Sequence, residues 1–274
     1  MKELTEYDQL QLGEKGIKVS KLQEQVALFL TGVPPVNLVA PAHVGTGILS
    51  LSRDEAIQCV ATYQKKKNSL DILKFVPASG SATRMFQFLS AFTSDFSPLE
   101  QTFEAYVKES GNVNVQIFFE HLTQFAFYES LQKYIQAHHS LEGLSEDEQK
   151  LRIAKILLEE EPFNYKNKPK GLFPFHKYGE KVVTAFEEHF REAFLYASQG
   201  EVVNIHFTIG KEYTNLFLST LAEIRPSLEK QYGVHFEVSF SHQSESTDTV
   251  ALTLDNEFFR DENNKLLFRP AGHG

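Results

Sequence analysis

Residues 72–89 read ILKFVPASGSATRMFQFL and contain three structural signals in succession. The apolar run 72–76 predicts a strand, the small residues of 77–84 predict a tight turn, and residues 85–89 predict the start of a helix. A strand, a short turn and a helix in this order open an α/β unit. We therefore expect an α/β fold with the turn at the carboxyl end of a strand.

The same alternation recurs near the end of the chain. Hydrophobic periodicity predicts helices over 181–197 and 212–231, and strands over 202–208, 234–240, 249–254 and 266–268. Strand–helix–strand order favours a mostly parallel sheet with right-handed crossovers. The pattern of residues 97–160 is helical throughout, and the proline- and glycine-punctuated tract 161–178 predicts a loop.

These patterns suggest how the chain is organised. Residues 1–68 form an N-terminal helical arm, and residues 69–274 form an α/β core with a helical insertion at about 90–165. Helix starts are predicted at Ser52 and Ser145, since each is followed three residues later by glutamate in the pattern of a capping box. The single cysteine, Cys59, lies in an apolar helical pattern and is expected to be a small core residue.

Composition excludes several classes of protein. The 274 residues include 36 acidic and 27 basic side chains, so the formal net charge is −9, which argues against a nucleic-acid binder. One cysteine excludes a disulfide framework, and the sequence shows neither a signal-peptide core nor an apolar run long enough to cross a membrane. We expect a cytoplasmic protein that binds neither nucleic acid nor membrane, and the oligomeric state is left open.

The turn that follows the first strand is the best candidate for a binding site. Small residues at such a turn let backbone N–H groups approach an anion, and an arginine adds donors suited to phosphate. The candidate nucleotide-binding residues here are Ala78, Ser79, Gly80, Ser81, Ala82 and Thr83, with Arg84 one turn into the helix. The segment lacks the Gly-Lys-Ser/Thr of a P-loop and the three spaced glycines of a dinucleotide-binding turn, and a plain tight turn is the alternative.

Two further segments suit a ligand site. Lys170 stands between Pro169 and Gly171, where a rigid loop presents its point charge to a phosphate oxygen, the alternative being a solvated lysine beside a turn. The chain ends in RPAGHG (residues 269–274), a glycine-containing loop after a strand that suits close approach of backbone to a ligand.

Taken together, these segments resemble the nucleotidyltransferase superfamily, especially the UDP-sugar pyrophosphorylases, which carry the motif Leu-Ala-Gly-Gly-x-Gly-Thr-Arg. Four residues match that motif: Ala78, Gly80, Thr83 and Arg84. Ser79 and Ala82 replace two of its glycines. Residues 169–171 match the Pro-Lys-Gly motif of those enzymes, in which that motif follows the glycine loop almost at once. Residues 270–274 resemble their Pro-x-Gly-His/Asn-Gly element. More closely, the chain resembles the N-terminal half of the bacterial domain-of-unknown-function 4301 family.

The resemblance implies a Rossmann-like nucleotidyltransferase fold (GT-A-like) that is incomplete at its C-terminus. It implies binding of a nucleoside triphosphate, with UTP the best guess, and in the full-length protein its joining to a sugar 1-phosphate with release of pyrophosphate. Arg84 and Lys170 would lie near the phosphates, and Gln243, Gly272 and His273 near the base. Mg²⁺ is expected as the cofactor, but its aspartate ligand in the pyrophosphorylases lies beyond the motif at which this chain stops. The alternative is a non-catalytic nucleotide or sugar-phosphate binding module, or an inactive fragment.

Overall fold

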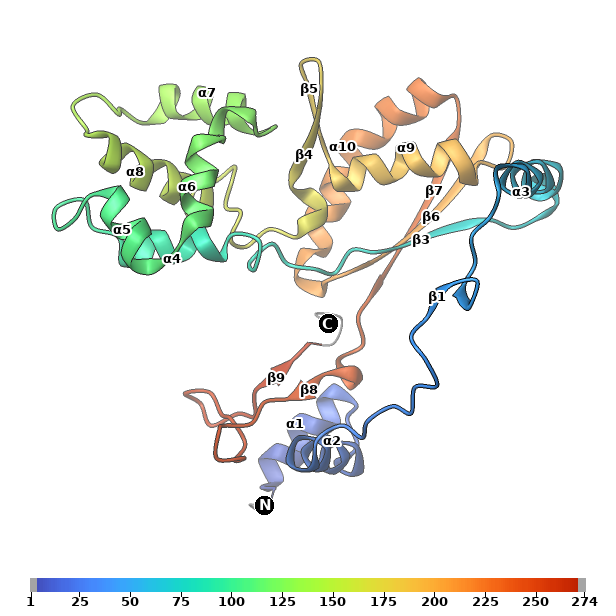
Figure 1. Cartoon of the computed structure of the whole chain (residues 1–274), viewed down its shortest axis with the longest axis horizontal. Coiled ribbons are helices and arrows are strands. Elements are labelled where there is room, and N and C mark those ends of the chain that lie inside the picture. Colours follow the sequence, from blue (N-terminus) through green and yellow to red (C-terminus); the bar gives the residue numbers. More distant parts are fainter. Residues whose placement is uncertain (1–3, 271–274) are drawn as a thin grey trace. The chain divides into compact units, whose positions relative to one another are not determined.

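The computed structural model describes residues 4–270 and shows a mixed α/β protein (Figure 1). The chain divides into two compact units, one of Ile72–Ser241 and one that combines Met1–Asp71 with His242–Gly274. The prediction divided the chain once, between residues 68 and 69. The structure instead groups the last segment with the first, because its strands pack against the N-terminal helices.

A small parallel sheet is the centre of the unit Ile72–Ser241. Its strands are β3 (Leu73–Pro77), β6 (Val202–Ile209) and β7 (His235–His242), in the order β3-β6-β7. Strands β3 and β6 are parallel, with Pro77 opposite Thr208. The predicted α/β class with a parallel sheet is therefore confirmed, whereas the nucleotidyltransferase fold stays a prediction.

One face of the sheet is covered by two helices, α9 (Ala185–Ala197) and α10 (Thr214–Tyr232) (Figure 1). Alternation along β6 directs Val203, Ile205 and Phe207 into this core, each with no exposed surface. Phe217 of α10 packs there too and is fully buried. Phenylalanine thus supplies much of the aromatic bulk in a chain that has no tryptophan.

The helical insertion forms a second core within the same unit. Its helices are α4 (Gln87–Asp95), α5 (Phe103–Ser110), α6 (Val113–Glu120), η2 (Leu122–Gln124), α7 (Tyr128–His138) and α8 (Glu146–Glu159). Phe92 lies at the centre, with ring centroids 4.9 Å from Phe96 and 5.6 Å from Phe103. The predicted capping box at Ser145 is present, with Glu148 donating its backbone N–H to the serine hydroxyl.

The chain returns from the insertion to the sheet through η3 (Lys170–Leu172) and a hairpin of β4 (Pro174–Tyr178) and β5 (Lys181–Thr184). The prediction of a loop at 161–178 and a helix from 181 is wrong at this hairpin. Gly179 at the turn has φ 61°, a conformation that glycine adopts without strain. Strand β4 is mostly exposed, so its sequence lacks the alternation that signals a half-buried strand.

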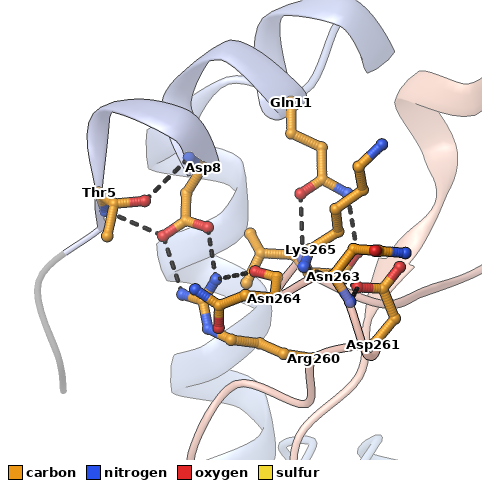
Figure 2. A network of polar contacts seen from close by, with 9 residues as sticks. Thr5, Asp8, Gln11, Arg260, Asp261, Asn263, Asn264 and Lys265 are labelled. Atoms are coloured by element: carbon orange, nitrogen blue, oxygen red, sulfur yellow. Dashed lines mark hydrogen bonds and ion pairs between the residues drawn. The ribbon is translucent and has the colours of Figure 1, made fainter.

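The other unit joins the two ends of the described chain. Helices α1 (Glu6–Lys15) and α2 (Val19–Thr31) share a small apolar core with β8 (Thr249–Val250). Strand β8 follows the short turn η5 (Glu245–Thr247) and pairs antiparallel with β9 (Phe268–Arg269). Figure 2 shows the polar contacts beside this core, in which the guanidinium of Arg260 donates two hydrogen bonds to the carboxylate of Asp8, of 2.7 and 2.9 Å.

In chain order, α2 is followed by β1 (His43–Val44), β2 (Gly47–Ile48), α3 (Arg53–Lys66) and η1 (Lys67–Ser69). The capping box predicted at Ser52 is confirmed. The prediction for Cys59 is wrong, because α3 has no buried residue and the thiol is exposed. Over residues 4–270, no helix combines the length and the apolar character that crossing a membrane requires.

Candidate functional site

The predicted turn lies at the carboxyl edge of the sheet. Since β3 and β6 are parallel, both strands end at this edge, and the backbone N–H of Ala78 donates to the carbonyl of Thr208 at 2.7 Å. The turn 78–84 and the turn after β6 therefore start side by side. Ligands of open α/β sheets bind at this edge, where loops rather than side-chain layers line the surface.

Two segments that are far apart in the sequence meet here. The N–H of Ala82 donates to the carbonyl of Lys168 at 3.0 Å, and the N–H of Lys170 donates to the carbonyl of Gly80 at 2.9 Å. These two bonds flank an antiparallel bridge between Ser81 and Pro169. The structure thus brings together the turn 78–84 and the lysine segment that the sequence singled out.

Three adjacent backbone donors in the turn are left without a protein acceptor. Ser81 and Pro169 face each other between the two bonds of the bridge, so the N–H of Ser81 points away from its partner strand. Within residues 4–270, the backbone N–H groups of Ser79, Gly80 and Ser81 donate to no protein acceptor. All three residues are partly exposed. Partly exposed backbone N–H groups of this kind can donate hydrogen bonds to an anion.

The other small residues of the turn have structural roles. The N–H groups of Ala78 and Ala82 are used by the sheet and by the bridge, and the methyl group of Ala82 is fully buried in the helical core. The hydroxyls of Ser81 and Thr83 lie 2.6 Å apart, and that of Thr83 also donates to the carbonyl of Lys166 at 3.2 Å. The amides available to a ligand are therefore fewer than the six residues predicted.

Arg84 is not in the helix. Its predicted place, one turn into the helix, is wrong, since Met85 and Phe86 both donate to the carbonyl of Ala82 in a turn and α4 begins only at Gln87. The side chain of Arg84 is exposed.

The two lysines of the second segment differ in environment. Lys170 is exposed and makes no ion pair with any residue in the described range 4–270, and its Cδ lies 3.8 Å from where a Cβ of residue 80 would stand. Lys168 instead donates to the carbonyl of Pro162 and lies 5.8 Å from the ring centre of Tyr165, and burial lowers the pKa of its ammonium group. Lys170 is thus the lysine that a ligand can reach.

The two segments that meet at the turn carry basic but no acidic side chains, although the chain as a whole is acidic. Residues 72–94 and 162–179 contain no aspartate or glutamate, whereas both ranges contain lysine or arginine. With a net charge of −9 over the chain, this concentration of cations favours an anionic ligand at the carboxyl edge.

Three further residues were predicted to lie near the base: Gln243, Gly272 and His273. Gln243 directly follows the last residue of β7 and is grouped with the other unit, whereas Gly272 and His273 lie outside the described residues. No group of three or more histidine, cysteine, aspartate or glutamate side chains in residues 4–270 is placed to hold a metal ion. The Mg²⁺ that the resemblance implies therefore stays a prediction.

The sequence patterns did not single out Glu212, an acidic residue at the same edge of the sheet. Glu212 lies in η4 (Lys211–Tyr213), directly after β6, and its carboxylate oxygens lie 2.8 and 2.9 Å from where a Cβ of residue 210 would stand. The signal was available, because an acidic side chain within three residues of the end of a parallel strand lies at the ligand edge of the sheet.

Comparison with known proteins identifies the family. No curated protein and no solved structure matches the chain. A family model described as Domain of unknown function (DUF4301) matches residues 5–274, which is nearly the whole chain and not one half of it. The chain therefore belongs to the family described as Domain of unknown function (DUF4301).

Proposed function

We propose that the protein binds the phosphates of a nucleoside triphosphate at the turn 78–84. The observation that supports this most strongly is that three adjacent backbone N–H groups, of Ser79, Gly80 and Ser81, find no acceptor in the described part of the chain. Lys170, exposed beside Gly80, adds a charge-assisted donor to the same place. UTP is the preferred nucleotide by resemblance to the UDP-sugar pyrophosphorylases.

As the activity of this site we propose nucleotidyl transfer. An oxygen of a sugar 1-phosphate attacks the α-phosphorus of the nucleotide in line, a new P–O bond forms, and pyrophosphate leaves with the electrons of the broken P–O bond. The turn amides hold the phosphates, Arg84 holds the departing pyrophosphate and Lys170 stabilises charge on the reacting phosphoryl group. Positioning and neutralisation of charge account for such a reaction without a covalent intermediate.

Binding without catalysis is the second candidate. It is favoured by one observation: two glycines of the pyrophosphorylase motif are replaced, by Ser79 and Ala82.

Binding is tested first, by calorimetric titration of UTP into the wild type and the variant Lys170→Met. Loss of a charge-assisted hydrogen bond is expected to weaken binding by about 1.5–3 kcal/mol, which is roughly tenfold or more. Lys230→Met is the matched control, because Lys230 is an exposed lysine in the last turn of α10, whereas α10 begins near the carboxyl end of β6. Equal affinity of both variants and the wild type would remove Lys170 from the site.

Catalysis is tested separately, by release of pyrophosphate from UTP in the presence of Mg²⁺ and a panel of sugar 1-phosphates. Release that depends on the sugar phosphate supports transfer. Binding of UTP without any release supports the binding module.

A further inference from the structure

The turn after β6 holds a carboxylate at a defined place. Gly210 lies two residues beyond Thr208, whose carbonyl accepts from Ala78 of the neighbouring turn. The N–H of Tyr213 donates to the carbonyl of Gly210 at 3.0 Å, and the hydroxyl of Thr214 donates to the carbonyl of Lys211 at 2.7 Å. These bonds close the turn, and the carboxylate of Glu212 lies back against Gly210.

The carboxylate of Glu212 has no partner among the residues that the structure describes. Glu212 is exposed, and it forms neither a hydrogen bond nor an ion pair with any residue of the described part, 4–270. A carboxylate only accepts hydrogen bonds, and its two oxygens suit two neighbouring hydroxyl groups. A metal ion is a poor alternative, because the described residues place no second and third acidic or histidine ligand beside it.

We propose that Glu212 recognises a vicinal diol on the phosphorylated ligand. The inference rests on the proposed function, because it requires the phosphates to bind at the turn 78–84. Neighbouring strands are about 4.8 Å apart, so the turn that carries Glu212 begins one strand from the turn that carries the amides of Ser79, Gly80 and Ser81. The ring that bears the phosphate then lies between them, with its hydroxyls toward Glu212.

A vicinal diol occurs both in the ribose of a nucleotide and in the ring of a sugar phosphate. The ribose arm of the test compares UTP with 2′,3′-dideoxy-UTP, and the sugar arm compares glucose 1-phosphate with 3-deoxyglucose 1-phosphate, which has no vicinal diol. Each pair is titrated calorimetrically into the full chain. Hydrogen bonds to a charged acceptor predict a preference of roughly tenfold or more for the hydroxylated compound in one of the two arms.

Two variants examine the carboxylate itself. Glu212→Gln removes its charge with little change in size. Gly210→Ala keeps the charge but displaces the carboxylate, since a methyl group would meet its oxygens at 2.8–2.9 Å while the backbone at φ −67° and ψ 136° accepts alanine. Glu223→Gln, which changes an exposed glutamate of α10, is the matched control.

We expect both variants to reduce the preference to less than about threefold, with the affinity for the deoxy compound unchanged and the control identical to the wild type. Tight binding of UTP and dideoxy-UTP alike, with no preference in the sugar arm, would overturn this inference and leave the proposed function standing. A preference that survives in Glu212→Gln would also overturn it. Failure of every phosphorylated compound to bind would instead overturn the proposed function and the inference with it.

Discussion

Single side chains hold together parts of the chain that are distant in sequence. Asp8 is fully buried in the structure, where it accepts two hydrogen bonds from Arg260 and one from the backbone of Thr5. The hydrogen bonds from Arg260 are the main reason that the pKa of Asp8 falls from 3.8 to about 2. The pairing of residues 8 and 260 could not be predicted from the sequence, because no local pattern relates them.

The Asp8 pair predicts a pH dependence. A carboxyl group with a lowered pKa stabilises the fold fully above about pH 4, and this contribution is lost as the pH falls toward 2. Asp8→Asn should lower the free energy of unfolding of the N-terminal helices by about 3 kcal/mol at neutral pH, since it leaves Arg260 without its charged partner. Hydrogen exchange of the α1 amides in urea measures this change.

Glu24→Gln is the control for Asp8, because Glu24 and Lys21 form an exposed ion pair 3.1 Å apart, and it should cost less than about 0.5 kcal/mol. If Asp8→Asn has the stability of the wild type and the same loss of stability between pH 4 and pH 2, the role assigned to the pair is wrong.

Elements with strong local signals were predictable, and those that depend on distant partners were not. The sequence indicated β3, β6 and β7 by their apolar runs and α3 and α8 by their capping boxes. The hairpin β4–β5 was missed because β4 is mostly exposed and carries no apolar alternation, and β5 is only four residues long. Arg84 was misplaced because the start of α4 has no side-chain cap to reveal it.

The capping box of α8 gives a prediction at this scale. Ser145→Ala removes the acceptor for the N–H of Glu148 and should lower the free energy of unfolding of the helical core by about 1 kcal/mol, measured by urea denaturation. Ser227→Ala, which changes an exposed serine inside α10, should leave stability unchanged or slightly raised. A loss no greater in Ser145→Ala than in the control would contradict this role of the cap.

At the scale of the whole molecule, the topology of the unit Ile72–Ser241 creates the candidate site. The helical insertion separates the turn 78–84 from Lys170 in sequence, and the chain then returns so that the two segments pair by backbone hydrogen bonds. The sequence identified both segments by residue type, but the pairing and the three unpaired amides follow from the bridge between Ser81 and Pro169. Net charge alone could not locate the positive edge of an acidic chain.

The central claim is that the amides of Ser79, Gly80 and Ser81 bind the phosphates of a nucleotide, and two-dimensional amide NMR of the ¹⁵N-labelled protein during titration with UTP tests it most directly. A phosphate oxygen as acceptor should move these three amide protons to lower field and slow their exchange, while the paired amides of Ala78 and Ala82 change little. Saturating UTP that leaves the three resonances unmoved, or that shifts amides only elsewhere in the chain, would contradict the account.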